Sequence, residues 1–159
     1  RPPAGPPRPI ASAAVMSGKS QGWQVLLRVV DANVNRAGEG LRVCEDLVRF
    51  GLDAPASFRR LRALRHGLNA VLRAVPVTTR EAVASRASAR DPGRRAPGSS
   101  SVRSLEHLLL MNLQRVKEAL RVLEETSRLL APRQTPRFQA LRFRAYDIER
   151  DLVAVLRHR

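Results

Sequence analysis

Charged and amide side chains recur in the same order at two places in the chain. The first copy reads Asn33-x-x-Arg36-x-x-Glu39-x-Leu41-Arg42-Val43-x-Glu45, and the second reads Asn112-x-x-Arg115-x-x-Glu118-x-Leu120-Arg121-Val122-x-Glu124. An Arg guanidinium is a planar fork that suits phosphate oxygens, and a Glu beside it can bind Mg²⁺ or orient the Arg. The repeated constellation is therefore a candidate site for a phosphorylated ligand.

A structural explanation competes with that hypothesis. Arg36 with Glu39, and Glu39 with Arg42, are three residues apart, so they can form ion pairs on a helix surface, each worth about 0.2–0.5 kcal/mol. For any single pair this explanation is the better one. Arg is nevertheless retained at three matched positions and Asn at another, although simple ion pairing would accept substitutes. Both explanations stay open.

Apolar residues at three- and four-residue steps predict two helices in the first half of the chain. One begins at Arg28, with Asp31 as a cap or first-turn acid, and stops at Gly51. The other begins after Pro55 and ends at Pro76. Together these two helices form a hairpin.

The second half of the chain repeats this arrangement. Ser104 opens a third helix, and Pro132 and Pro136 mark the turn to a fourth helix. Residues 33–45 and 112–124 are identical at seven of thirteen positions at a constant offset of 79. The sequence therefore predicts an all-α fold, namely a four-helix bundle of two duplicated antiparallel hairpins joined by a long loop. The expected hairpins cover residues 28–74 and 104–158, and the central loop covers 75–103.

Two segments interrupt the helical pattern. The central loop is rich in Pro, Gly, Ser and Arg, and a loop of this length is usually functional or disordered, so we interpret it as a candidate lid. Residues 1–22 contain five prolines in their first nine positions. We expect them to form a disordered tail ahead of one helical domain over residues 23–159.

Two glycines, Gly38 and Gly40, lie inside the first predicted helix, where each costs up to about 1 kcal/mol relative to Ala. Close packing of helices is one explanation, and close approach of a ligand is the other. The residue matched to Gly40 in the second copy is Ala119, which favours packing at that position.

The chain is strongly basic, with a formal net charge of +15, which is typical of nucleic-acid-binding proteins. Of its 29 basic residues, however, 27 are Arg, a bias more typical of a GC-rich coding sequence than of a selected phosphate-binding surface. The single cysteine, Cys44, excludes an internal disulfide, and no apolar run approaches the roughly 20 residues that span a bilayer. We therefore expect a cytoplasmic protein without a membrane segment, and we disfavour nucleic-acid binding.

The repeated words resemble those of a known family. Three segments carry the resemblance: Asp31-Ala32-Asn33-Val34-Asn35-Arg36-Ala37-x-Glu39-Gly40-Leu41-Arg42-Val43-x-Glu45-Asp46, Leu64-Arg65-His66, and Asn112-Leu113-x-Arg115-Val116-x-Glu118-Ala119-Leu120-Arg121-Val122-Leu123-Glu124-Glu125. They are similar to the monofunctional hydroxymethylpyrimidine phosphate kinase domain of thiamin biosynthesis, which occurs alone or fused ahead of thiamine-phosphate synthase. The resemblance covers residues 28–156. It implies ATP-dependent phosphorylation of 4-amino-5-hydroxymethyl-2-methylpyrimidine phosphate to its diphosphate, with Mg²⁺.

The family usually has an Arg-Asp pair and an Asp-Val-Gly word in the central loop. The corresponding residues here are Arg86-Ala87 and Asp91-Pro92-Gly93. The loop thus keeps the Arg, the second Asp and the Gly of that pattern, whereas Ala and Pro replace the first Asp and the Val.

Phosphoryl transfer needs charge neutralisation and positioning more than a reactive side chain, so we expect the duplicated polar residues and the central loop to share the site. Which copy binds nucleotide and which binds substrate stays open. In this hypothesis the phosphate oxygens are bound by Arg36, Arg115, Arg121 and Arg86. The Mg²⁺ ion is held by Glu39, Glu118 or Asp91. The pyrimidine or phosphate is oriented by Asn33 and Asn112, and the nucleotide-binding set is completed by Arg42 and Gly93.

Two other functions remain open, and so does a homodimer. The chain could be a non-catalytic helical module that binds thiamine-phosphate synthase or its substrate. It could also be a basic nucleic-acid-binding bundle, although four Phe, one Trp and one Tyr offer few rings for base stacking.

Overall fold

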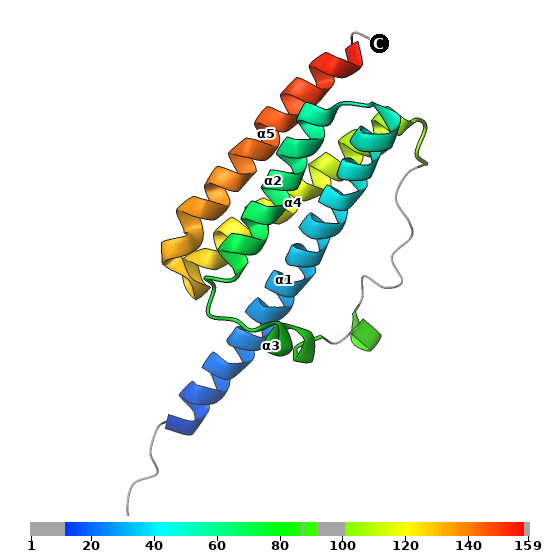
Figure 1. The fold of residues 1–159 in the computed structure, drawn as a ribbon. Helices are drawn as coiled ribbons and strands as arrows, with labels where there is room; N and C mark the ends of the chain where they lie inside the picture. The colour runs from blue at the N-terminus through cyan, green and yellow to red at the C-terminus, as the bar shows by residue number, and fades with distance from the viewer. Residues whose placement is uncertain (1–11, 87, 92–100, 158–159) are drawn as a thin grey trace, which may run out of the picture.

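The computed structural model describes residues 12–86, 88–91 and 101–157, and within these ranges it is helical and contains no strand. This confirms the all-α class. Four long helices account for most of the chain (Figure 1). In chain order the elements are α1 Ser12–Asp46, η1 Leu47–Gly51, α2 Pro55–Leu72, α3 Thr79–Ala84, η2 Ser88–Arg90, α4 Leu105–Leu130, η4 Pro132–Gln134 and α5 Thr135–Arg157.

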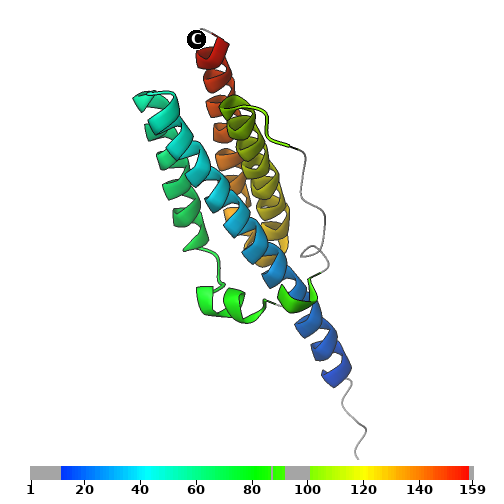
Figure 2. The same cartoon turned by 90° about the vertical axis from the view of Figure 1, so that its right-hand side faces the viewer.

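Helix α1 begins earlier than the sequence pattern indicates. We expected a start at Arg28 and a tail over residues 1–22, whereas α1 is already helical at Ser12; residues 1–11 lie outside the described ranges. After Pro9 no proline interrupts the chain until Pro55, so a helix anchored in the core can extend toward the N-terminus at little cost. The first turns of α1 project beyond the other helices (Figures 1 and 2). Asp31 consequently lies inside the helix and does not cap it.

The other helix ends follow the expected signals. The chain leaves α1 through a π-helical turn that ends at Gly51, and Pro55 occupies the first turn of α2. The Ser104 side chain accepts a hydrogen bond from the backbone N–H of His107 and so caps α4. These local signals fix where each long helix begins or ends.

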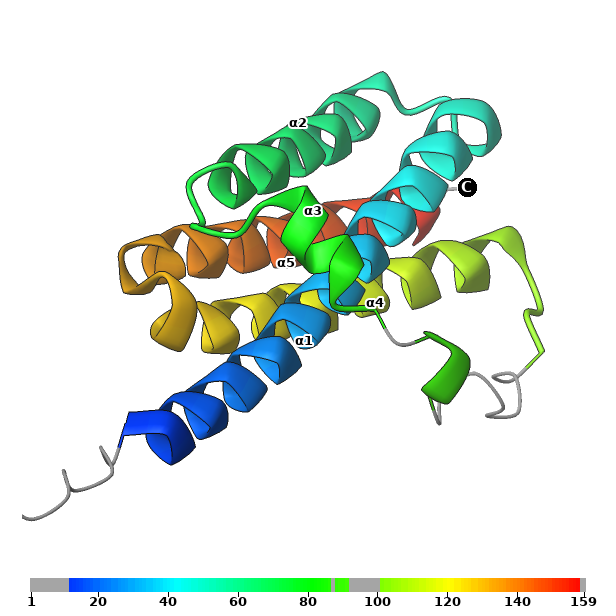
Figure 3. The ribbon, with the colours of Figure 1, turned by 90° about the horizontal axis from the view of Figure 1, so that it is seen from below.

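The four long helices pack through one apolar core. The most extensive contact joins α1 and α4, followed by α4 with α5 and α2 with α5. The two helices of each hairpin run antiparallel, and so do α1 and α4 (Figures 1 and 3). Fully buried leucines from both hairpins fill the centre; they include Leu41, Leu61, Leu113, Leu120 and Leu152.

Gly40 permits the close approach of α1 to α4. A Cβ atom at this position would lie 2.9 Å from Val116 Cγ2 and 3.1 Å from the carbonyl oxygen of Asn112. Helix packing therefore explains this glycine. Gly38 differs, because a Cβ atom there would meet nothing within 4 Å, and its face of α1 borders a groove.

Equivalent polar residues make equivalent contacts in the two hairpins. The side-chain amide of Asn33 donates to the Val29 carbonyl at 2.7 Å, and that of Asn112 donates to the Leu108 carbonyl at 2.8 Å. Both asparagines are buried. Their repetition is therefore accounted for by a hydrogen bond within each helix.

A short helix lies in the segment that we expected to be a loop. Helix α3 is closed by a capping box, in which the Thr78 hydroxyl accepts from the Glu81 backbone N–H and the Glu81 carboxylate accepts from the Thr78 backbone N–H. It packs against α1 (Figure 3). Six residues are too few to give a clear apolar period, so the sequence pattern missed this helix. No helix among the described residues is long and apolar enough to cross a bilayer.

Candidate functional site

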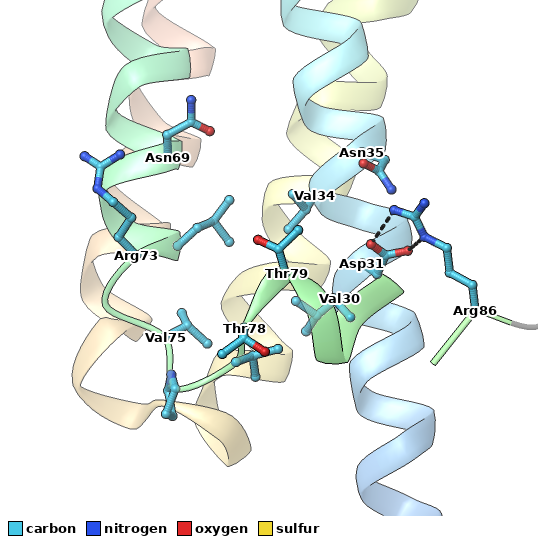
Figure 4. Close-up of a pocket in the computed structure, with 14 residues that line it drawn as sticks. Val30, Asp31, Val34, Asn35, Asn69, Arg73, Val75, Thr78, Thr79 and Arg86 are labelled. Atoms are coloured by element: carbon cyan, nitrogen blue, oxygen red, sulfur yellow. Dashed lines mark hydrogen bonds and ion pairs between the residues drawn. The ribbon is translucent and has the colours of Figure 1, made fainter. Parts of the chain in front are cut away.

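A groove of about 660 Å³ separates α1 from α2, and α3 with the residues around it forms its third side (Figure 4). A second hollow of about 320 Å³ continues along the same two helices and shares Val34, Asn35 and Asn69 with the first. Pockets of this size hold small-molecule ligands and cofactors. The groove is therefore the candidate functional site.

The groove has an apolar floor and a polar rim. Val30, Val34, Leu72 and Val75 supply apolar lining surface. Asn35 and Asp31 extend from α1, Asn69 and Arg73 lie across the groove on α2 and at its C-terminus, and the two threonines before and at the start of α3 lie between these walls (Figure 4). An apolar floor with a few convergent polar groups is the usual lining of a small-molecule site.

Arg86 ties the segment after α3 to α1. Its Nε and Nη2 donate to the two carboxylate oxygens of Asp31 at 2.6 and 2.8 Å. This hydrogen-bonded contact with Asp31 raises the pKa of Arg86. The Asp31 side chain is 13% exposed and that of Arg86 is 46% exposed, so the pair forms one rim of the groove and its Arg side faces water.

Several polar groups of the groove lack an internal partner. Among the described residues, no ion pair joins Arg42 or Arg73 to an acid, and no side-chain hydrogen bond engages Asn35, Asn69 or the Glu39 carboxylate. Arg65, by contrast, is held by the Glu45 carboxylate at 2.6 and 3.0 Å. The groove thus presents two guanidinium groups that have no ion-pair partner among the described residues, an arrangement that suits an anionic ligand.

Sequence comparisons agree on one family. A profile described as the ThiD2 family matches residues 28–151. The chain belongs to the ThiD2 family. Thiamine-phosphate synthase of a Nostoc species is 38% identical over 144 residues, which cover 89% of this chain and 39% of that protein. Thiamine-phosphate synthase of Thermosynechococcus vestitus is 37% identical over 131 residues, which cover 81% of this chain and 36% of that protein.

The chain spans about two fifths of the length of these curated relatives. The comparisons therefore connect this ThiD2-family chain with thiamin biosynthesis through relatives that are longer than the chain and that it matches in part. No solved structure matches the chain.

Three of the residues singled out from the sequence meet in the groove of this ThiD2-family chain. Glu39 and Arg42 line its smaller hollow, and Arg86 lines the larger one. Two others on α1 are placed differently. Asn33 is buried and makes the hydrogen bond within α1 described above. Arg36 is exposed, and its Nη1 lies 3.5 Å from Asn33 Oδ1.

The matched residues of the second copy lie on α4 and do not line this groove. Arg121 forms ion pairs with Glu124 and Glu125 at 2.9 and 2.8 Å. Glu118 accepts a hydrogen bond from Gln114 at 2.8 Å. Arg115 is exposed, and Asn112 is buried where Gly40 approaches it. The two copies of the polar motif are thus on different helices and do not both line this groove.

Two predicted residues belong to the central segment. Asp91 is exposed directly after η2, and Gly93 lies outside the described residues. Across the part of the chain that the structure describes, no group of three or more His, Cys, Asp or Glu side chains is arranged to hold a metal ion. A metal here would have to use fewer protein ligands.

The sequence pattern did not single out Asn35, Asn69, Arg73 or Thr79 as site residues, although all four line the groove. None of them belongs to the set of identical residues in the repeat. Differences between the two copies could have pointed to the groove. Gly38 is matched by Lys117 at the offset of 79. Leu64 and Leu141 give an offset of 77 for the second helices, at which Asn69 is matched by Tyr146.

Proposed function

We propose that this chain phosphorylates 4-amino-5-hydroxymethyl-2-methylpyrimidine phosphate to the diphosphate in thiamin biosynthesis, with ATP as phosphate donor. The observation that supports this proposal most directly is the open groove in which Arg42 and Arg73 have no ion-pair partner among the described residues. Both the substrate and the nucleotide are anions that such guanidinium groups bind. Membership of the ThiD2 family agrees with a role in the thiamin pathway.

The lining of the groove suits an aminopyrimidine. Val30, Val34 and Val75 give an apolar surface for the ring. The side-chain amides of Asn35 and Asn69 can donate to a ring nitrogen and accept from an amino group, as amide side chains do with nucleobases. We therefore assign the ring to the space between these two asparagines and the phosphate to the arginines.

The reaction needs little acid–base chemistry from the protein. A phosphate oxygen of the substrate attacks the γ-phosphorus of ATP, a new P–O bond forms, the bond to the β-phosphate oxygen breaks, and ADP leaves. The attacking oxygen is already ionised, so no general base is required. The residues act by positioning the two anions and offsetting their mutual repulsion, and Arg42 and Arg73 are available for both tasks, whereas Arg86 is already paired with Asp31.

The lining residues also fit a Mg²⁺ ion. Magnesium in phosphoryl-transfer sites is bound through one or two carboxylates together with substrate phosphates, so a cage of protein ligands is not required. When bound, the ion neutralises charge on the phosphates. Glu39 lines the groove without a hydrogen-bond partner among the described residues and is the carboxylate available to the ion, whereas both carboxylate oxygens of Asp31 are held by Arg86. Of the acids expected from the sequence, Glu39 is retained in this proposal.

The test is a coupled assay with the purified chain, ATP, Mg²⁺ and the pyrimidine monophosphate. We expect formation of the diphosphate together with ADP, and loss of both in Arg73→Gln. Arg150→Gln is the matched control. Arg150 on α5 corresponds to Arg73 at the offset of 77 but is paired with Asp147 and Asp151. If the wild-type chain forms no diphosphate above a control without enzyme, the proposed activity is wrong.

A second function is favoured by one observation. The relatives are named thiamine-phosphate synthase, and the chain covers about two fifths of them. The chain would then be a non-catalytic helical module that binds a thiamine-phosphate synthase or its substrate. Co-purification with a synthase, combined with a negative kinase assay, would support this alternative over the kinase.

A further inference from the structure

The groove between α1 and α2 has a counterpart between α4 and α5, because the two hairpins are copies. At the offset of 79, Asn35, Gly38, Glu39 and Arg42 of α1 correspond to Gln114, Lys117, Glu118 and Arg121 of α4. At the offset of 77, Asn69 and Leu72 of α2 correspond to Tyr146 and Glu149 of α5. The two surfaces can therefore be compared position by position.

Larger side chains occupy the counterpart. Lys117, which replaces Gly38, extends to the Glu149 carboxylate, with Nζ 2.7 Å from Oε1. The same ammonium group lies 5.4 Å from the centre of the Tyr146 ring, which replaces Asn69. Only 11% of the Lys117 side chain is exposed. In the first hairpin, the space beside Gly38 is open.

The polar groups of the counterpart are also satisfied internally. Arg121 is paired with Glu124 and Glu125, Glu118 accepts from Gln114, and the Tyr146 hydroxyl accepts from Arg142 at 3.4 Å. Their equivalents Arg42, Glu39, Asn35 and Asn69 have no such partners in the described part of the chain. The residue types of the copies are similar, yet among the described residues these particular groups are paired in the second copy and unpaired in the first.

We propose that the second hairpin holds a closed copy of the groove, so that the chain binds one pyrimidine phosphate, and that Gly38 and Asn69 keep the first copy open. The identity of the ligand rests on the function proposed above. Lys117, Tyr146 and Glu149 fill the second copy with their own side chains and charges. Gly38 and Asn69 are thus the residues that determine which hairpin binds the ligand.

The test transfers the closing residues to the open groove. Binding of the pyrimidine monophosphate, without nucleotide, is measured by calorimetry on the full chain. We expect one molecule per wild-type chain and loss of binding in Gly38→Lys/Asn69→Tyr. The Lys adds positive charge, which by itself attracts an anionic ligand, so loss of binding reports that the space has been filled.

A reciprocal variant identifies the hairpin that binds. Lys117→Ala/Tyr146→Asn changes only the second copy, so we expect it to retain the wild-type affinity of the first groove. Two molecules per wild-type chain, loss of binding in this reciprocal variant, or full binding in Gly38→Lys/Asn69→Tyr would each overturn the inference. Circular dichroism checks that the variants fold. If Gly38→Lys/Asn69→Tyr does not fold, the single variant Asn69→Tyr must lower the affinity for the pyrimidine monophosphate.

This experiment separates the two proposals. A chain that binds one pyrimidine phosphate in the first groove but does not phosphorylate it retains the inference and loses the proposed activity. A chain that phosphorylates the substrate but is insensitive to closure of the first groove retains the activity and loses the inference.

Discussion

Arg142 holds the buried carboxylate of Glu124, with its Nε 2.7 Å from one carboxylate oxygen and its Nη2 3.4 Å from the other. Arg65 holds Glu45 in the same way in the first hairpin. Both glutamates come from the first helix of a hairpin and both arginines from the second. A buried carboxylate is costly unless it is paired, so each pair specifies how its hairpin closes.

Removing one partner of such a pair should be strongly destabilising. We expect Glu124→Gln to lower the free energy of unfolding by about 3 kcal/mol, because the Arg142 guanidinium loses its charged acceptor in a largely buried site. Urea unfolding followed by circular dichroism measures the change. Glu125→Gln is the matched control, since Glu125 is its neighbour but is 43% exposed, and it should change stability by less than about 1 kcal/mol. Equal effects of the two substitutions would contradict this account.

The fold could be predicted from the sequence to a large extent, because its determinants are local. Pro55 begins α2, Ser104 caps α4 and Gly51 ends the first long helical segment, as expected. The repeated motif predicted two similar hairpins, and matched residues make similar contacts, such as Arg65 with Glu45 and Arg142 with Glu124. The start of α1 and the short helix α3 could not be found in this way. They depend on extension of an anchored helix and on one capping box, neither of which gives a long apolar period.

The site was less predictable, for a physical reason. A residue that is identical in both copies satisfies a requirement common to both hairpins, and in this protein that requirement is often structural, as Asn33, Asn112 and Glu124 show. In our proposal the groove is open in the first hairpin and closed in the second, so it depends on residues that differ between the copies, such as Gly38 and Asn69. The contact of Arg86 with Asp31 joins residues 55 positions apart, a distance that local periodicity cannot bridge.

The two glycines of α1 should respond in opposite ways to the same substitution. Gly40→Ala places a methyl group 2.9 Å from Val116 Cγ2 and 3.1 Å from a backbone oxygen that cannot move freely, so we expect a destabilisation of about 1–3 kcal/mol. Gly38→Ala meets nothing within 4 Å and should stabilise the helix by up to about 1 kcal/mol. Thermal unfolding of the two variants tests both signs, and a stabilised Gly40→Ala would show that α1 and α4 are less closely packed.

The single cysteine should be inert in the folded chain. Burial, assisted by the nearby Glu45 carboxylate, raises the pKa of the Cys44 thiol to about 12, so almost no thiolate forms at neutral pH. We expect Cys44 to react with a thiol-specific disulfide reagent only as fast as the chain unfolds. Labelling across a urea series, with the fully unfolded chain as reference, measures this rate. Rapid labelling of the native chain would contradict the buried position.

The cap of α3 should make the segment beside the groove sensitive to acid. Hydrogen bonds from the Thr78 hydroxyl and backbone N–H hold the pKa of the Glu81 carboxyl below its ordinary value, which is about 4.3 in unstructured peptides. Because the folded-state pKa is lowered, the stabilisation is complete above the unfolded value and is lost as the pH falls through the folded one. Carbon-detected NMR of the Glu81 carboxyl should show a midpoint below about 4.3 that moves upward in Thr78→Val. An unchanged midpoint in that variant would show that the hydroxyl does not set it.

Arg42 and Arg121 are identical residues at equivalent positions, and they should differ in function. Arg42 lines the open groove without an ion-pair partner among the described residues, whereas Arg121 is paired with two glutamates. If Arg42 binds a phosphate group, its loss removes a charge-assisted hydrogen bond worth about 1.5–3 kcal/mol, which corresponds to a roughly ten- to hundredfold fall in kcat/KM. Arg121→Gln should leave kcat/KM near the wild-type value, because its partners are acids of the same helix. The coupled kinase assay measures both variants, and equal losses would mean that the two hairpins contribute alike to the site.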